Sequence, residues 1–298
     1  MKYINFSSRS LKLFLVFSLF YCFGYSQNKV IQISPIKVAY KKIDTISLNL
    51  HIYKPLNFSK DSTYNCILFF HGGGWNNGNY KSFHRQAMYF ASRGIIAISA
   101  EYRINSKHKT TPFEAVEDAK SAMRYLRKHA QDLNINPNMI AAGGGSAGGH
   151  LAAACALIEG LDNTKEDLTI STVPNALVLL NPVIDNGPDG GFGYNRFKNR
   201  YKEISPIHNI TKNAPPTIIL NGTKDEFVPV KVIDNYKSKM EAVGSRCDVI
   251  FYEGVGHAFF AKPPTKYFVE TTYESDLFLI SLGFLKAKPT IKEQYSIN

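Results

Sequence analysis

The sequence has few cysteines, four in 298 residues, and no paired histidines or cysteines at metal-ligand spacing. We therefore predict no metal site. Cys66, Cys155 and Cys247 each lie in or beside an apolar segment, which indicates buried thiols rather than a disulfide framework. One disulfide with a third thiol left over stays open as an alternative.

Acidic residues are also in the minority, with 24 Asp and Glu against 35 Lys and Arg and a net charge of +11. Such a balance is compatible with anionic surfaces or acidic polysaccharides as partners. The lysines are scattered along the chain, which favours a solvated basic surface instead. No nucleic-acid-binding motif accompanies the charge, so we expect no nucleic-acid partner.

No apolar run is long enough and suitably flanked to favour a permanent membrane span. The run at 11–20 follows basic residues and is followed by the small residues Gly24 and Ser26, a pattern typical of a cleaved export signal. We predict a signal peptide at 1–26 and one domain at 27–298, secreted or periplasmic, with no stable membrane insertion after cleavage. An uncleaved anchor is the alternative.

The remaining pattern predicts an α/β fold. Residues 37–53 alternate between apolar and polar side chains, as antiparallel strands do. Short apolar runs that suit buried strands lie at 66–70, 95–99, 139–142, 176–180, 217–220 and 249–252. Helical patterns lie between or after them at 81–93, 112–129, 147–159, 231–243 and 273–285. This alternation predicts a mostly parallel central sheet with helices on both faces. The irregular segments 160–174 and 185–202 are expected to be loops over one end of that sheet.

Glycines are concentrated around one serine. Residues 143–150 read Gly-Gly-Gly-Ser-Ala-Gly-Gly-His, which contains the G-x-S-x-G pattern of a serine on a sharp strand-to-helix turn. Glycine removes the Cβ atoms that would collide across such a turn. Ser146 is therefore the candidate nucleophile.

The same residues also match a second motif. Gly143, Gly145 and Gly148 satisfy G-x-G-x-x-G, the dinucleotide-binding fingerprint. That motif belongs after the first strand of its fold and needs an acidic residue about 20 positions further on. Here it comes late in the chain, and Glu159 follows Gly148 by only 11 residues. The run by itself does not choose between a hydrolase and a nucleotide-binding protein.

A second glycine run, His71-Gly72-Gly73-Gly74-Trp75, follows the apolar run at 66–70. Unscreened backbone N–H groups can stabilise the negative oxygen that forms when a carbonyl is attacked. Gly73 and Gly74 are candidate donors, and Ala147, directly after the serine, is a third. Considered alone, the run would be a plain glycine turn.

A serine nucleophile needs a base, and the base needs a carboxylate that orients it. Asp225 follows the apolar run at 217–220, and His257 follows the run at 249–252. Both residues fall in loops after buried strands, in the order Ser, Asp, His that α/β-hydrolases use. Glu226, beside Asp225, is a weaker candidate for the acid.

With these motifs the sequence resembles an α/β-hydrolase of the hormone-sensitive-lipase and bacterial carboxylesterase type over nearly all of 27–298. The resemblance rests on residues 71–75, 101–103, 135–137, 144–151, 182, 225, 228–229 and 254–259. It implies a triad of Ser146, Asp225 and His257, with Gly73, Gly74 and Ala147 as the oxyanion hole. The tryptophan that closes the first glycine motif is similar to that of secreted acetyl-xylan and feruloyl esterases. Residues 27–55 look like strand rather than the helical cap of hormone-sensitive-lipase relatives, which implies no large cap domain and an open site.

The function expected from these patterns is a secreted serine esterase that forms an acyl-enzyme and uses no cofactor. Its substrates would be short-chain or carbohydrate-linked acetyl or feruloyl esters, either small molecules or polysaccharides. Trp75 and Phe259 are the candidate substrate-binding residues, with core positions as the alternative. An amidase or peptidase on the same triad and a non-catalytic binding protein on a hydrolase fold remain alternatives, and the oligomeric state stays open.

Overall fold

The computed structural model describes residues 32–261 and 265–295, whose strands form one eight-stranded sheet. The strands are β1 (Ile36–Ile43), β2 (Ile46–Tyr53), β3 (Tyr64–Phe70), β4 (Ile96–Ala100), β5 (Ile135–Gly145), β6 (Ala176–Leu180), β7 (Thr217–Gly222) and β8 (Cys247–Tyr252). Their order is β1-β2-β4-β3-β5-β6-β7-β8. β1 and β2 pair antiparallel at one edge, and all pairs from β4 to β8 are parallel. The predicted fold class is confirmed.

The central strands are apolar throughout because both faces of the sheet are covered. All residues of β4 and β6 are buried. Along β3, Leu68 joins the core on one face, while Ile67 and Phe69 join the core on the other. This alternation follows from the two-residue period of a strand.

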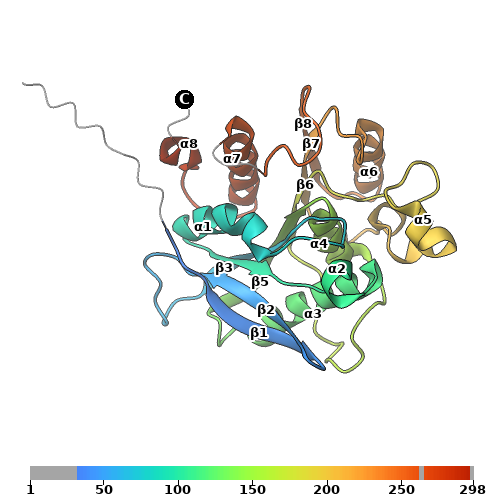
Figure 1. The fold of residues 1–298 in the computed structure, drawn as a ribbon. Coiled ribbons are helices and arrows are strands. Elements are labelled where there is room, and N and C mark those ends of the chain that lie inside the picture. The colour runs from blue at the N-terminus through green and yellow to red at the C-terminus, as the bar shows by residue number, and fades with distance from the viewer. Residues whose placement is uncertain (1–31, 262–264, 296–298) are drawn as a thin grey trace, which may run out of the picture.

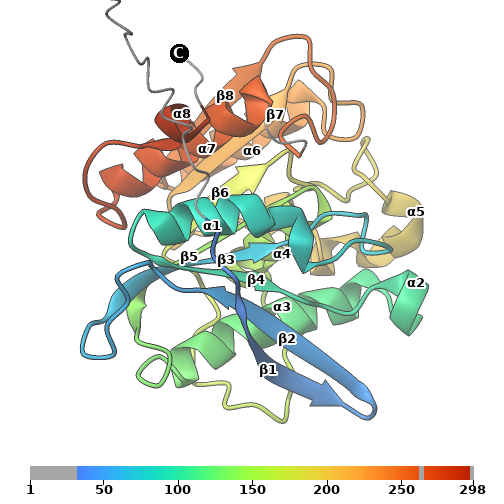
Figure 2. The same cartoon turned by 60° about the vertical axis from the view of Figure 1, so that its left-hand side comes forward.

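Helices pack on both faces of this sheet (Figures 1 and 2). The longer ones are α1 (His84–Ser92), α3 (Pro112–Lys128), α4 (Ala147–Leu157), α6 (Val230–Ala242) and α7 (Lys266–Ser281), and the short ones are α2 (Asn105–His108), α5 (Tyr194–Phe197) and α8 (Ile291–Gln294). Buried side chains of α3, α4 and α6 belong to one core, and those of α1, α7 and α8 belong to the other.

Two predictions for the helices were wrong in detail. α7 begins at Lys266, seven residues before the predicted start, because the Thr265 side chain caps it by accepting a hydrogen bond from the N–H of Phe268. The segment 185–202, predicted to be a loop, contains α5 and the start of a 3-10 helix at Lys198–Glu203. Helices this short leave no periodic pattern in a sequence.

Cys66, Cys155 and Cys247 are free and buried, so the disulfide alternative is wrong for these three residues. Burial raises the pKa of each thiol above its ordinary value, which makes these thiols unreactive.

The predicted signal peptide at 1–26 lies outside the described residues, and the domain bounds that depend on it stay a prediction. Within 32–261 and 265–295, no helix has the length and apolar character needed to cross a membrane.

Candidate active site

Ser146 occupies the turn between β5 and α4. Its backbone angles, φ 55° and ψ −122°, are strained for a residue with a side chain. Neighbouring backbone groups hold this conformation: the Ser146 N–H donates to the carbonyl of Leu180 at 3.0 Å, and its own carbonyl accepts from the N–H groups of His150 and Val183 at 3.0 and 3.2 Å. These hydrogen bonds hold the strained backbone of Ser146 in place, and with it the Cβ atom that carries the hydroxyl.

The glycines around Ser146 allow close backbone packing. A Cβ atom on Gly144 would lie 2.5 Å from the carbonyl oxygen of Phe70, and one on Gly148 would lie 2.0 Å from the same oxygen. A Cβ atom on Gly143 would lie 2.8 Å from the carbonyl oxygen of Val178. Close contacts with the backbone of neighbouring strands thus explain why glycine occupies these three positions. Binding of a dinucleotide is not needed to explain them.

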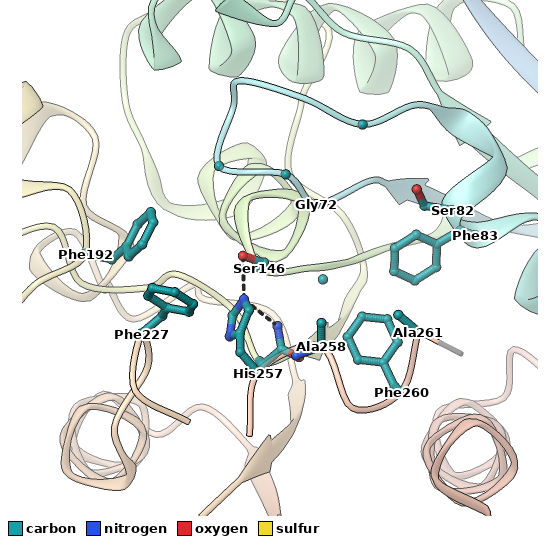
Figure 3. A pocket seen from close by; sticks show the side chains of 15 residues that line it. Gly72, Ser82, Phe83, Ser146, Phe192, Phe227, His257, Ala258, Phe260 and Ala261 are labelled. Atoms are coloured by element: carbon teal, nitrogen blue, oxygen red, sulfur yellow. Dashed lines mark hydrogen bonds between the residues drawn. The ribbon is translucent and has the colours of Figure 1, made fainter. Parts of the chain in front are cut away.

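The structure brings Ser146, His257 and Asp225 into one hydrogen-bonded chain. His257 Nε2 lies 2.8 Å from Ser146 Oγ, and His257 Nδ1 lies 2.7 Å from Asp225 Oδ2; Figure 3 shows the contact between the serine and the histidine. A carboxylate at Nδ1 holds the proton there, so Nε2 is left to accept the serine proton. Asp225 and His257 meet because β7 and β8 are neighbouring parallel strands that end at the same edge of the sheet.

Asp225, and not Glu226, contacts the histidine. The Asp225 side chain is fully buried, and its Oδ1 accepts hydrogen bonds from the N–H groups of Phe227 and Val228, both at 2.9 Å. Glu226 is exposed to solvent. These two backbone donors stabilise a charged carboxylate and orient its other oxygen toward His257.

Asn181 is a site residue that sequence reasoning missed. It directly follows β6, is fully buried and has a positive φ of 37°, which asparagine tolerates. Its Oδ1 accepts from the N–H of Ala258 at 3.1 Å, and its Nδ2 lies 3.4 Å from His257 Nε2. Asn181 therefore holds the loop that carries His257. No motif in the sequence distinguishes it from any other polar residue after a strand.

The glycine loop after β3 presents free backbone donors to the same cavity. Gly73 and Gly74 have positive φ values of 116° and 60°, and both line the cavity with Ser146. Within the described part of the chain, neither of their N–H groups donates to a protein acceptor. Ala147 begins α4, so its N–H lacks an acceptor inside the helix. These are the three donors that the sequence predicted for the oxyanion.

Two other histidines near the site are structural. His71 stacks on Tyr102 at 4.2 Å, and the Tyr102 hydroxyl donates to the His71 carbonyl at 2.7 Å beneath the glycine loop. His150 packs under the turn, with its Nε2 2.7 Å from the carbonyl oxygen of Ile204. Burial lowers the pKa of His71 and of His150 to about 4 each, so both are neutral at neutral pH.

The cavity in front of Ser146 has a volume of about 460 Å³ and two aromatic ends. Phe83 and Phe260 lie on one side of Ser146, while Phe192 and Phe227 lie on the other (Figure 3). Phe83 and Phe260 are buried, whereas Phe227 is 52% exposed. The side of the cavity with Phe227 is therefore open to solvent, and the buried rings of Phe83 and Phe260 form part of the wall on the other side, beside the exposed residues Ser82 and Ala261.

Among the described residues, neither of the two predicted substrate-binding residues, Trp75 and Phe259, lines this cavity, so a role in binding stays a prediction for both. Trp75 is 2% exposed, and its ring packs against those of His150, Phe192 and Phe197. Its φ is positive, at 57°, and its indole belongs to the core.

Phe259 packs between Tyr252 and Tyr267, at ring distances of 5.0 and 5.7 Å. The next residue, Phe260, faces the cavity instead.

A serine on the turn after β5, an acid after β7 and a histidine after β8 of a mostly parallel sheet define the class of α/β-hydrolases with a Ser-His-Asp triad. Comparisons with known proteins agree with this assignment to the α/β-hydrolases. Residues 50–188 match the family model described as BD-FAE, and residues 192–277 match the dienelactone hydrolase family.

Similar proteins of known structure or known name indicate which α/β-hydrolases this chain resembles. Esterase 2 of Thermogutta terrifontis, in its apo form, superposes with a TM-score of 0.82 at 39% identity, over 86% of this chain and 97% of that one. Esterase LipC of Mycobacterium tuberculosis is 27% identical over 65% of this chain and 52% of its own length, and the acetylxylan esterase of Xylanibacter ruminicola is 29% identical over 74% and 45%. The chain spans about half the length of these curated relatives. It belongs to the α/β-hydrolase family, among the serine esterases of the hormone-sensitive-lipase-like type.

Proposed function

We propose that this chain is an exported esterase that hydrolyses short-chain acyl esters of carbohydrates through an acyl-enzyme. The observation that carries the proposal is the continuous hydrogen-bonded chain from Ser146 Oγ through His257 to Asp225, at the floor of an open cavity.

The reaction follows from this geometry. Ser146 Oγ attacks the ester carbonyl as its proton moves to His257 Nε2, and the N–H groups of Gly73, Gly74 and Ala147 stabilise the oxyanion. The tetrahedral intermediate expels the alkoxide, which takes the proton from His257. Water then attacks the acyl-serine and gives a proton to His257. Collapse of this second intermediate returns that proton to Ser146 and releases the carboxylic acid.

The shape of the cavity supports a short acyl group. The buried rings of Phe83 and Phe260 form one wall beside Ser146, and an acyl chain that extends toward them meets packed side chains. Structures of the Thermogutta terrifontis esterase with propionate bound and with butyrate bound show that this relative binds short acids.

A bulky alcohol such as a sugar polymer has room to extend from the cavity beside the exposed ring of Phe227. The matches to the BD-FAE model and to an acetylxylan esterase support a carbohydrate alcohol. The pattern at residues 1–26 supports export, to which a polymeric substrate is suited.

A substrate panel tests the acyl preference. With 4-nitrophenyl esters and a chain of residues 27–298, we expect the highest kcat/KM for acetate to butyrate. We expect a value roughly tenfold to a hundredfold lower for laurate, since forcing methylenes against packed rings costs about 1–3 kcal/mol. Phe260→Ala should raise the laurate-to-acetate ratio within the same variant, which removes any effect of the amount folded.

Acetate release from acetylated xylan, measured together with the nitrophenyl esters, tests whether the alcohol part of the substrate is a carbohydrate. Release by the wild-type chain and none by Ser146→Ala is the expected result. A preference for laurate would contradict the short-acyl assignment. Turnover of nitrophenyl acetate with no release from acetylated xylan would contradict the carbohydrate assignment.

A further inference from the structure

A second cavity of about 330 Å³ adjoins the catalytic cavity at the glycine loop. Its lining residues are Gly74, Trp75, Asn76, Asn105, Thr110, Thr111, Pro112 and Arg196. Gly74 lines both cavities, so a single residue of the oxyanion loop separates them. Its lining includes the polar side chains of Asn76, Asn105, Thr110, Thr111 and Arg196, in contrast to the four phenylalanines around Ser146.

Arg196 gives this second cavity a positive charge. Its Nη1 donates to the carbonyl of Gly74 at 3.0 Å, which leaves most of the five guanidinium N–H groups available. Within the described residues, no carboxylate lies at ion-pair distance from Arg196, and no Asp or Glu lines the cavity. Arg200, on the same segment, is by contrast paired with Glu203.

Two side chains of this lining, Trp75 and Thr110, have polar atoms, Nε1 and Oγ1, that are buried and form no hydrogen bond. Because these atoms expose almost no surface to the cavity, a ligand would be held by the other polar groups of the lining. Asn105 donates its Nδ2 to the Thr110 carbonyl at 2.9 Å, which holds its amide in the wall of the cavity.

The cavity lies within reach of a substrate bound at Ser146. Arg196 bonds to the carbonyl of the residue whose N–H is a candidate oxyanion donor. Backbone bond lengths and two hydrogen bonds place the guanidinium within about 10 Å of the oxyanion. That distance is comparable with the length of a disaccharide.

We propose that this second cavity is a subsite for a carboxylate-bearing sugar unit, of the uronic acid type, in the alcohol part of the substrate. The proposal rests on the ester hydrolysis proposed above. The Arg196 guanidinium pairs with the carboxylate, for which its planar fork is suited. The side-chain amides of Asn76 and Asn105 bind the sugar hydroxyls.

Matched substrates test the subsite. We would measure acetate release from acetylated xylo-oligosaccharides with and without a glucuronic acid side group. The wild-type chain should favour the charged substrate, and Arg196→Gln should lower that preference roughly tenfold, the lower end of the loss expected for a hydrogen bond to a charged group. Arg196→Lys should keep part of the preference, and added salt should weaken it in the wild-type chain.

Lys202→Gln is the matched control, because it removes one positive charge from the same segment outside the cavity. It should keep the wild-type preference. The subsite is overturned if the wild-type chain does not favour the charged substrate, or if Arg196→Gln and Lys202→Gln lower the preference equally. Hydrolysis of 4-nitrophenyl acetate, measured in parallel, separates these outcomes from a failure of the esterase proposal itself.

Discussion

Ser146→Ala is expected to lower kcat for 4-nitrophenyl acetate by about four to six powers of ten, as losses of a triad nucleophile do. The hydroxyl is the only reactive group of the Ser146 side chain, and its oxygen lies 2.8 Å from Nε2 of His257, the base. Alanine keeps the Cβ atom, and thus the steric demands of the turn at φ 55°, but offers no atom to form the acyl bond. The initial rate of nitrophenolate release from purified wild-type and variant chains measures the effect.

Ser238→Ala is the matched control for this change. Ser238 is exposed on α6, and its hydroxyl donates to the carbonyl of Asp234 within the same helix. It should keep the wild-type rate, and both variants should show the wild-type circular dichroism spectrum. A folded Ser146→Ala chain that retained a tenth of the wild-type rate would rule out Ser146 as the nucleophile.

Asp225→Asn is expected to lower kcat by roughly 10⁴, the loss known for this change in a Ser-His-Asp triad. The amide has nearly the shape of the carboxylate, so the fold should be kept. Because the amide can turn an N–H toward His257 Nδ1, it favours the tautomer with the proton on Nε2, which cannot accept the serine proton. The pocket that now stabilises a charged carboxylate with two backbone donors would hold a neutral group.

Glu226→Gln removes the neighbouring carboxylate and serves as the control for that experiment. Glu226 is exposed, so its loss should leave kcat within about twofold of the wild-type value, as surface substitutions usually do. The reverse pattern, with a tolerated change at Asp225 and a crippling one at Glu226, would assign the acid to Glu226.

The sequence was sufficient to predict that the structure brings Asp225 and His257 together with Ser146. The glycines near Ser146 are required because a Cβ atom at these positions would clash with the carbonyl oxygens of Phe70 and Val178. The packing of the fold therefore determines a local sequence pattern that can be recognised. Asp225 and His257 were predictable because each follows a buried strand, and parallel neighbouring strands end at one edge of the sheet.

The direction of individual side chains was not predictable in the same way. The indole of Trp75 packs in the core, and Phe260 rather than Phe259 faces the cavity. Asn181 acts through a contact between the end of β6 and a residue 77 positions later, which depends on how β6, β7 and β8 lie side by side. No local pattern carries that information.

Covalent labelling tests the central claim most directly. The Thermogutta terrifontis esterase has been solved phosphorylated by paraoxon. Attack of Ser146 Oγ on paraoxon would expel 4-nitrophenolate and leave a diethylphosphoryl group on the serine. Mass spectrometry of the treated chain of residues 27–298 should find one such group, on the peptide that contains Ser146, together with loss of ester hydrolysis and no label in Ser146→Ala. A label on a different residue, or an active chain that takes up none, would contradict the assignment of Ser146 as the nucleophile.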